Sequence, residues 1–458
     1  MKQVLIGVGS GLVAGSLALT LLFLGPLSGS NGAESETTAT ASALPDATVS
    51  AAPEPSAVET ASEPEVIECS VAELEAADGI LSLQAQVIDT ETEQVLFDRS
   101  SDIPARAASV MKLFTAAAAL ETLGPGYQVT TRVYQDAADP SKIYLVGAGD
   151  VTLSRTAINK ESVYKKAPKL ADLAKQATAF LAGVPVSEIV LESSLYGTDS
   201  GEYQSVWDLR GLSNGYMSPV SALQVDGDRE NPAAKDSPRS TDPVQQAGTW
   251  FQESLGDTAL DAVISKGLTP PDAVQIASVK SRPISEWIDY MLVVSDNTLA
   301  EALARLVSLD TGLDGSFDSL TKAYTTALKN TGLDLTGLKV EDGSGLSKYN
   351  QVAPNQVNEL LALIDEGYGD FEVILGGMPV SGTPGSLSYR FEDAVGSITA
   401  KTGWIRTGYT LAGFLVSPDQ TRLRFTVYNL GDVTADNREA MDDLVMGFYA
   451  CGADLVNR

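Results

Sequence analysis

The chain has 458 residues with 31 Lys and Arg against 60 Asp and Glu, a formal net charge of −29, two cysteines and no histidine. Without histidine it cannot build a Ser-His-Asp triad, a Cys-His dyad or a His-ligated zinc centre, so proton chemistry near neutral pH would need lysine, tyrosine or a carboxylate as the base. Two cysteines are too few for a four-thiolate metal site, and the negative charge argues against a nucleic-acid partner, whose phosphates need cationic neutralisation.

The N-terminal segment 1–28 is predicted to direct export. The stretch Val4–Ser30 carries no charge, its apolar core is about long enough to cross a bilayer as a helix, and one cation, Lys2, precedes it. We expect residues 4–28 to contact the cytoplasmic membrane, either as an uncleaved anchor or as a signal peptide that is removed. The length of the apolar run favours the anchor. Either way, the rest of the chain is expected outside the cytoplasm.

Residues 29–66 are predicted to form a disordered linker. They consist almost entirely of Ala, Ser, Thr, Pro and Glu and offer few side chains that could be buried. Because such a composition cannot offset the chain entropy lost on folding, we expect a tether between the N-terminal segment and the folded body.

The two cysteines flank the folded body. Cys69 follows the linker and Cys451 lies near the C-terminus. Since a disulfide is permitted outside the cytoplasm, we predict one bridge that joins the first element of the body to the last. The alternative is two unpaired thiols in separate parts of the core.

The body is predicted to begin with a hairpin and a helix. Residues 80–98 alternate apolar and polar around an Asp-Thr-Glu-Thr-Glu centre, which is typical of two antiparallel strands. From Ser109 the chain is Ala-rich with apolar residues at helical spacing, and Gly124-Pro125-Gly126 predicts the helix end.

Residues 127–275 are predicted to be an inserted α/β domain within a main domain made of 67–126 and 276–458. The insertion mixes strand-like runs with a helix around 168–182 and a loop rich in Pro, Asp and Ser at 226–243. Asp226-Gly227-Asp228 in this loop lacks the further spaced ligands of a calcium loop, so a solvated turn is expected there.

The main domain resumes with helices and ends with strands. Three helical patterns cover 284–307, 317–332 and 354–367, and a further helix is expected near 434–450. Between them, three strands joined by short turns are predicted over 397–405, 410–416 and 423–430. Helices followed by an antiparallel run of strands indicate the α+β class, with helices packed on an antiparallel sheet.

Three short motifs on these elements can carry chemistry. Ser109-Val110-Met111-Lys112 opens the first helix, Ser295-Asp296-Asn297 lies within the 284–307 pattern, and Lys401-Thr402-Gly403 lies in a strand. Each is common by chance, since S-x-x-K occurs on many helices, Ser-Asp-Asn often caps a helix, and Lys-Thr-Gly often precedes a turn. All three in this order, on helix, helix and strand, are a specific signal.

The first motif supplies the base that a chain without histidine needs. Positions i and i+3 share a helix face, so Lys112 can reach the hydroxyl of Ser109. Free backbone N–H groups at the helix N-terminus favour a developing oxyanion. A free lysine titrates near about 10.4, and burial with a second nearby cation would lower its pKa toward neutrality. Lys401 is the candidate for that second cation.

In these motifs the sequence resembles the penicillin-recognising serine enzymes. Within that superfamily it is similar to the D-alanyl-D-alanine carboxypeptidases of the peptidase S13 type, the low-molecular-mass class C penicillin-binding proteins. The likeness covers roughly 70–458 and includes four further segments: GAGDVTL (147–153), NGYMSPVSALQVD (214–226), EDGSGLSKYN (341–350) and SGTPGSLSYRF (381–391). It implies a β-lactamase/transpeptidase-like main domain and an extracytoplasmic enzyme of the bacterial cell wall.

The resemblance implies a role for each matching residue. Ser109 would be the acylated nucleophile, Lys112 its general base and Ser295 a relay that passes the proton to the leaving amine. The expected oxyanion hole consists of the backbone N–H groups of Ser109 and of the residue after the third motif. Five positions would bind the substrate. Asn297 would bind the peptide carbonyl of the substrate, and Lys401 and Thr402 would bind its terminal carboxylate. Gly403 and Trp404 complete the set, and Trp404 stands where the family often has a hydroxyl residue.

The implied substrates are peptidoglycan stem peptides ending in D-Ala-D-Ala, with β-lactams as acylating inhibitors and no metal or cofactor required. The same machinery could serve a D,D-endopeptidase. A class A β-lactamase shares the three motifs but needs a Glu-x-x-Leu-Asn-like loop between the second and third, and neither Glu341 nor Glu359 has that pattern. A non-catalytic sensor or wall-binding protein with the same fold is the remaining alternative.

Overall fold

The structure is a computed structural model that describes residues 69–199 and 202–456. The predicted export segment 1–28 and linker 29–66 lie outside the described residues. Among the helices of the described ranges, none combines the length and the apolar character that a bilayer-spanning helix needs.

The described chain has the predicted order of elements: a hairpin and a helix, the insertion, a run of helices, three strands and a last helix. The helices are α1 (Ala72–Glu75), α2 (Met111–Leu123), α3 (Leu170–Leu181), α4 (Arg210–Asn214), α5 (Pro243–Leu255), α6 (Ile284–Val294), α7 (Asn297–Asp310), α8 (Leu320–Ala327), α9 (Pro354–Asp365), α10 (Glu372–Gly377) and α11 (Ala435–Cys451). The strands are β1 (Leu83–Asp89), β2 (Val95–Arg99), β3 (Thr130–Gln135), β4 (Lys142–Val146), β5 (Glu188–Glu192), β6 (Val263–Lys266), β7 (Val274–Lys280), β8 (Ile398–Ile405), β9 (Gly408–Val416) and β10 (Arg422–Leu430).

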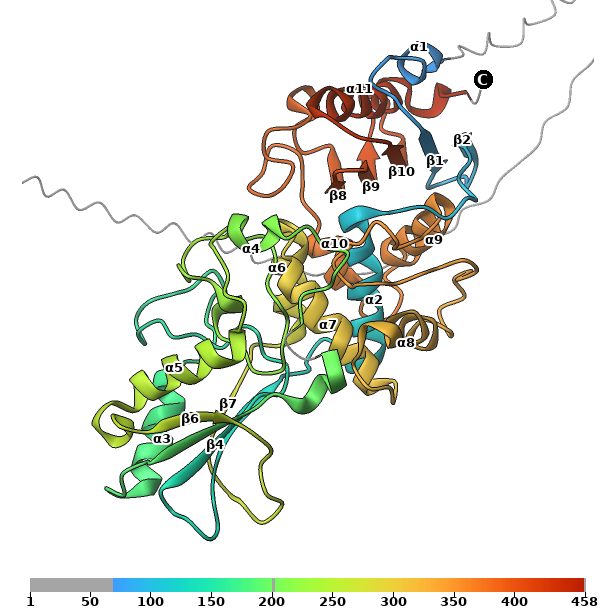
Figure 1. The fold of residues 1–458 in the computed structure, drawn as a ribbon. Coiled ribbons are helices and arrows are strands. Elements are labelled where there is room, and N and C mark those ends of the chain that lie inside the picture. The colour runs from blue at the N-terminus through green and yellow to red at the C-terminus, as the bar shows by residue number, and fades with distance from the viewer. Residues whose placement is uncertain (1–68, 200–201, 457–458) are drawn as a thin grey trace, which may run out of the picture. The chain divides into compact units, whose positions relative to one another are not determined.

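The main sheet is antiparallel and has the strand order β2-β1-β10-β9-β8. The hairpin and the three C-terminal strands predicted from the sequence are therefore confirmed. Figure 1 shows α11 on one face of this sheet and the helices α2, α9 and α10 toward the other. Apolar residues alternate between the two faces, so Leu411 and Leu415 pack toward α11 while Ala412 and Phe414 join the helical core. The α+β fold of the β-lactamase/transpeptidase type is confirmed.

The helical pattern over 284–307 is two helices rather than one. Ser295 adopts a left-handed conformation with φ 60° and ends α6, and the Asp296 side chain accepts a hydrogen bond from the backbone N–H of Leu299 at 2.9 Å as the N-cap of α7. The apolar period continues through the break, which hides it in the sequence. The break places the second motif at a helix junction.

The insertion contains a five-stranded mixed sheet in the order β6-β5-β4-β3-β7. The pairs β4–β5 and β5–β6 are parallel, whereas β3 pairs antiparallel with β4 and with β7. The predicted helix is present as α3, and α3 and α5 pack in the same apolar core as this sheet. Because β7 runs to Lys280 along β3, we propose that the insertion ends at Lys280 rather than at 275.

The turn Asp226-Gly227-Asp228 is not solvated, contrary to the expectation from sequence. Both aspartates are buried, and all three residues have positive φ values of 51°, 58° and 64°. Its polar composition indicated a surface turn, but inside the protein Arg155 pairs with Asp226 and Ser240 donates to Asp228. Among the described residues, no group of three or more Cys, Asp or Glu side chains forms a metal site.

A disulfide joins Cys69 and Cys451, with their Cα atoms 5.4 Å apart. It links the first described residue to the end of α11, as predicted. The backbone N–H of Cys69 also donates to the carbonyl of Asp454 at 2.9 Å. The two ends of the described chain are thus fixed to each other beside the main sheet.

Candidate active site

The first motif lies where α2 begins. Ser109 sits in a short 3₁₀ turn, Ala108–Val110, directly before α2, and Lys112 lies in the first turn of that helix. The Lys112 side chain is fully buried and its Nζ is 2.9 Å from Ser109 Oγ. The structure therefore brings the predicted nucleophile and base into hydrogen-bond contact.

Lys112 has two further contacts, both with groups that can only accept. Its Nζ donates to Asn297 Oδ1 at 2.6 Å and to the carbonyl of Ser344 at 2.5 Å. The Asn297 amide is oriented by its Nδ2, which donates to the carbonyl of Tyr216 at 2.9 Å. A neutral amine has two N–H groups and one lone pair. With both N–H groups engaged by these acceptors, the lone pair is left for the hydroxyl proton of Ser109.

Burial favours this neutral state of the amine. Burial lowers the pKa of Lys112 to about 7, while the carboxylates of Asp342 and Asp296 act in the opposite direction. An amine with a pKa near 7 can be unprotonated at the pH at which the enzyme must work. The site thus contains an amine that could act as a base without histidine.

The loop 341–350 holds the Ser344 carbonyl against Lys112. Asp342 accepts from the backbone N–H groups of Gly345 at 2.6 Å and Ser347 at 2.7 Å, and from Trp207 Nε1 at 2.8 Å. This contact of the loop with Lys112 was not predicted from the sequence, although the segment resembles the family. A backbone carbonyl that binds the base leaves no side-chain signal, so only the surrounding Asp-Gly-Ser-Gly pattern pointed to it.

The second and third motifs meet each other beside the first. Lys401 Nζ on β8 donates to Ser295 Oγ at 2.9 Å and to the carbonyl of Thr402 at 2.8 Å. Burial, together with the charge of Lys112, holds the pKa of Lys401 well below its usual value. From the sequence, Lys401 was the candidate for the cation that lowers the pKa of Lys112. The charge of Lys112 does lower the pKa of Lys401, but the cation that lowers the pKa of Lys112 is Lys235 of the insertion.

Gly403 allows β8 to pass close to Ser109. A Cβ atom on Gly403 would lie 2.1 Å from Thr410 Oγ1 and 2.8 Å from the backbone nitrogen of Ser109. No other residue fits there without moving the strand or the nucleophile. Thr402 Oγ1 donates to Ser386 Oγ at 2.8 Å, which ties the third motif to the 381–391 segment.

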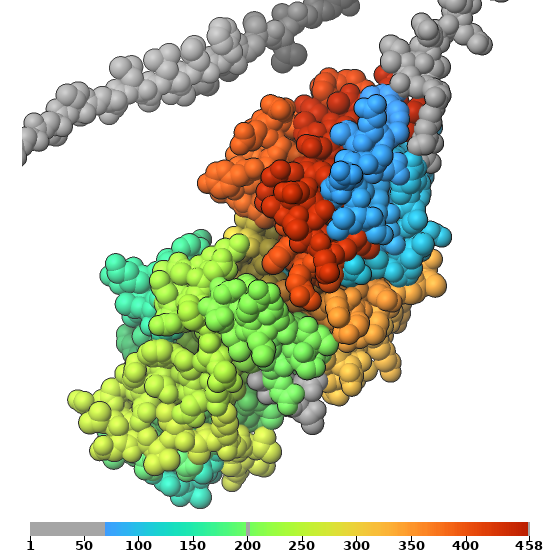
Figure 2. Space-filling view, turned by 45° about the horizontal axis from the view of Figure 1, so that its top comes forward, coloured from blue at the N-terminus to red at the C-terminus, as the bar shows by residue number. Residues whose placement is uncertain are grey.

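A cleft of about 870 Å³ opens above these motifs. Six of the predicted site residues line it, namely Ser109, Ser295, Asn297, Thr402, Gly403 and Trp404, and the two lysines lie beneath its floor. Residues 206–216 of the insertion form the opposite wall, and in Figure 2 the green surface of the insertion lies against the orange and red C-terminal surface. The Trp404 side chain is 53% exposed, so an apolar ring replaces a hydroxyl at the cleft wall.

Comparison with known proteins agrees with this geometry. Residues 70–239 and 229–448 match the D-Ala-D-Ala carboxypeptidase 3 (S13) family. The chain is 30% identical over 379 residues to carboxypeptidase DacB of Mycolicibacterium smegmatis, covering 81% of each protein. It is 31% identical over 380 residues to carboxypeptidase Rv3627c of Mycobacterium tuberculosis, covering 81% of this chain and 80% of that protein.

The fold agrees as well. The structure is similar to the crystal structure of penicillin binding protein 4 (dacB) from Haemophilus influenzae, with a TM-score of 0.67 and 19% identity over 83% of this chain and 99% of that one. Fold, motif order and family match therefore coincide. The chain belongs to the D-Ala-D-Ala carboxypeptidase 3 (S13) family of serine-type peptidases.

Proposed function

We propose that this protein is a serine-type D-Ala-D-Ala carboxypeptidase that trims peptidoglycan stem peptides through an acyl-enzyme on Ser109. The observation that carries the proposal is the contact between Lys112 Nζ and Ser109 Oγ at 2.9 Å, with the other two contacts of Nζ made to acceptors. This arrangement supports removal of the hydroxyl proton by a neutral amine.

In the acylation step, Lys112 takes the proton of Ser109, and Oγ attacks the carbonyl carbon of the penultimate D-Ala. The backbone N–H groups of Ser109 and Trp404 would stabilise the oxyanion that forms. The peptide C–N bond then breaks, and Ser295 would relay the proton taken up by Lys112 to the departing amine of the terminal D-Ala, so that both residues return to their starting state. Water completes the cycle by hydrolysing the ester on Ser109.

The third motif would recognise the terminal carboxylate of the substrate. Thr402 lines the cleft, and Lys401 lies beneath it with a pKa well below its usual value. An anion beside the amine favours its charged form, so substrate binding would protonate Lys401 as it docks. Asn297 would bind the peptide carbonyl through its amide. β-Lactams carry a comparable carboxylate and amide carbonyl and would acylate the same hydroxyl.

The protein acts outside the cytoplasm, where its disulfide and its peptidoglycan substrate are both expected. Attachment to the cytoplasmic membrane through residues 4–28 and a tether over 29–66 are parts of the proposal that rest on sequence. The division into a main domain, 67–126 with 276–458, and an insertion, 127–275 or slightly longer, has the same status.

The test is labelling with fluorescent penicillin combined with release of D-Ala from a peptide ending in D-Ala-D-Ala. We expect one covalent adduct per chain, located on Ser109 by peptide mass, and release of free D-Ala. Ser109→Ala should abolish both. Full labelling of Ser109→Ala would refute the assignment of the nucleophile.

The same assay separates the alternatives. A serine β-lactamase would turn over the antibiotic rapidly, and a non-catalytic sensor would form the adduct without releasing D-Ala. Products of digested cell-wall fragments, identified by mass, would distinguish cleavage of a terminal D-Ala from cleavage of a cross-link and so measure any D,D-endopeptidase activity.

A further inference from the structure

We propose that Arg229, which lies in the insertion and outside all three motifs, is a positioning residue that neutralises Asp296 and so keeps Lys112 available as a base at neutral pH. The proposal rests on the function proposed above, with Lys112 as the base. It assigns the insertion a part in the chemistry in addition to its part in the cleft wall.

Arg229 and Asp296 form a buried ion pair between the insertion and the second motif. Arg229 Nη2 lies 2.7 Å from Asp296 Oδ2, and the two side chains are 2% and 3% exposed. Tyr164, also from the insertion, accepts from Arg229 Nη1 at 2.8 Å and donates to Asp296 Oδ2 at 3.3 Å. Since an isolated buried charge is costly, each member of this pair depends on the other.

The backbone before Arg229 is shaped to aim its side chain at Asp296. The left-handed run 226–228 turns the chain inward, and Arg229 Nη1 donates back to the carbonyl of Asp226 at 3.1 Å. A Cβ on Gly227 would lie 2.5 Å from Arg229 Nη1 and 2.7 Å from Tyr164 Oη. Glycine is thus required both by its φ and by the guanidinium that passes over it.

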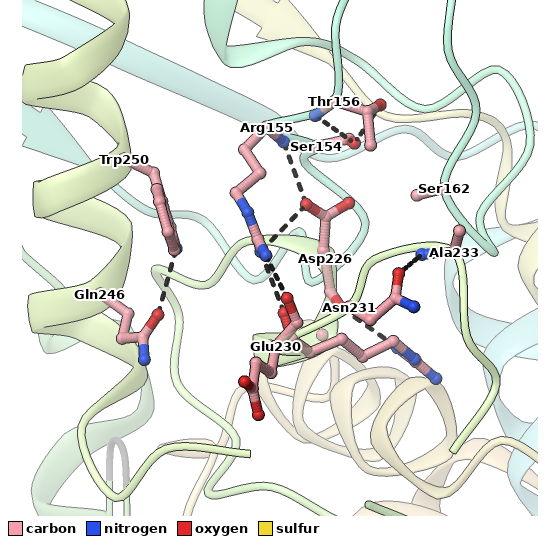
Figure 3. A network of polar contacts seen from close by, with 12 residues as sticks. Ser154, Arg155, Thr156, Ser162, Asp226, Glu230, Asn231, Ala233, Gln246 and Trp250 are labelled. Carbon is pink, nitrogen blue, oxygen red and sulfur yellow. Dashed lines mark hydrogen bonds and ion pairs between the residues drawn. The ribbon is translucent and has the colours of Figure 1, made fainter. Parts of the chain in front are cut away.

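A second arginine fixes this loop from the other side (Figure 3). The backbone N–H of Arg155 donates to Asp226 Oδ2 at 3.0 Å. Its guanidinium donates to the carbonyls of Arg229 at 2.9 Å and Glu230 at 2.5 Å and stacks over Trp250. The backbone of Arg229 is therefore held by contacts within the insertion.

Asp296 connects this pair to the base. It caps α7, and its neighbour Asn297 is the first residue of that helix and accepts from Lys112. The charged groups that act on Lys112 come from three segments: Asp296 and Glu301 from α7, Asp342 from the loop 341–350, and Lys235 from the insertion. Lys112 in turn acts on Lys401 of β8. Asp296 is itself compensated by Arg229 and Arg239 of the insertion.

Removing Arg229 would leave Asp296 near Lys112 with only the weaker compensation of Arg239. Although burial acts to raise the pKa of Asp296, the charges of Arg229 and Arg239 hold it below its usual value. Asp296 would stay at least partly ionised through Arg239, and its negative charge would favour protonated Lys112. Removing Asp296 should shift the pKa of Lys112 in the opposite direction, because the positive charge of an uncompensated Arg229 disfavours protonated Lys112.

The experiment measures the second-order rate constant for acylation of Ser109 by penicillin from pH 5 to pH 9. We expect Arg229→Met to raise the apparent pKa of the acid limb of the pH–rate profile by about one pH unit. Acylation would then be about tenfold slower at pH 6 and much less affected at pH 9. Asp296→Asn, which keeps an amide able to cap α7, should move the limb downward. The double variant should return it close to its original position.

Opposite shifts cannot come from a general loss of structure, which would lower the plateau of both variants. Arg229→Lys keeps the charge and should restore most of the original profile. Arg424→Met is the matched control, because Arg424 is also buried and pairs with an acid, Glu93, at the β1–β2 turn. The acid limb of the pH–rate profile of this variant should not move. If Arg229→Met does not fold, the downward shift in Asp296→Asn still tests the sign.

The outcomes separate this inference from the proposed function. If the unaltered protein forms no adduct on Ser109, the proposed function fails. If it acylates with an acid limb near pH 7 but Arg229→Met and Asp296→Asn leave that limb in place, the proposed function stands and the role of Arg229 is wrong.

Discussion

At the scale of single residues, the proposed function depends on one amine, Lys112, whose pKa is lowered toward neutrality. Lys112 is fully buried, and burial lowers its pKa to about 7. A lysine in the unfolded chain titrates near about 10.4. Between these two values the unfolded state binds more protons than the folded state, so the free energy of unfolding should rise with pH across this window. The base thus carries a stability cost at neutral pH.

Lys112→Met should therefore separate activity from stability. Without a base, acylation by penicillin should fall by about 10²–10⁴-fold. At pH 7 the free energy of unfolding should rise by on the order of 1–3 kcal/mol, and its increase between pH 7 and pH 10 should flatten. Urea unfolding at several pH values measures both effects. Exposed Lys175 provides the control, since Lys175→Met should change neither property. A destabilised Lys112→Met with an unchanged pH slope would contradict the account.

Gly403→Ala tests the close approach of β8 to the nucleophile. The added methyl would lie 2.1 Å from Thr410 Oγ1 and 2.8 Å from the nitrogen of Ser109, so the strand or the 3₁₀ turn must shift. We expect at least a tenfold loss in acylation rate, because misplacement of reacting groups by about 1 Å costs roughly 10²-fold. Gly376→Ala is the matched control, since a Cβ at Gly376 meets no atom within 4 Å. Equal acylation rates in the two variants would show that the approach at Gly403 is not required.

At the scale of elements, the junction between α6 and α7 presents the second motif. Ser295 is held at φ 60°, a left-handed conformation that glycine adopts more easily than serine. Ser295→Gly and Ser295→Ala both remove the hydroxyl that contacts Lys401.

We expect both Ser295 variants to lose carboxypeptidase activity, but with different stabilities. Ser295→Gly relieves the backbone and should be more stable than Ser295→Ala by about 0.5–1 kcal/mol. Thermal unfolding of the two proteins, paired with D-Ala release, makes the comparison. Full activity in Ser295→Gly would show that the hydroxyl is dispensable.

The elements show how far sequence reasoning reaches. Apolar periods predicted the hairpin at 80–98, the helix after Ser109 and the three C-terminal strands, because each buries a regular face. The same period concealed the break at Ser295, since a left-handed residue interrupts the backbone without interrupting the apolar pattern. The S-x-x-K contact was predictable because it is local to one helical turn.

Contacts between distant segments were harder to predict from the sequence. The carbonyl of Ser344 and the pairing of Arg229 with Asp296 depend on how separate loops meet, and neither leaves a pattern in the neighbouring sequence. The Asp226-Gly227-Asp228 turn was predicted to be solvated because its composition is polar, whereas hydrogen bonds from Arg155 and Ser240 allow its burial. The order and type of the motifs predicted which side chains come together, but not the contacts that they make with distant loops.

At the scale of the whole molecule, one disulfide fixes the ends of the described chain. Cys69 and Cys451 are separated by 382 positions in sequence, so the bond constrains a very long loop of the unfolded chain.

Replacing both cysteines with serine should lower the free energy of unfolding by about 2–5 kcal/mol while leaving D-Ala release at 25 °C nearly intact. The disulfide lies beside α11, on the face of the main sheet opposite the helical core that holds α2. Reductant should destabilise the original protein by a similar amount and have no effect on the double variant, which provides the control. A double variant as stable as the original would show that the bond adds nothing to the fold.

The most direct test of the central claim is the pH dependence of Ser109 acylation in the unaltered protein. If a neutral Lys112 is the base, the rate constant should increase through a single acid limb with an apparent pKa near 7 and reach a plateau above it. A rate that stays constant down to pH 5, or that continues to rise beyond pH 9, would contradict a lysine whose proton affinity the folded protein has lowered to neutrality.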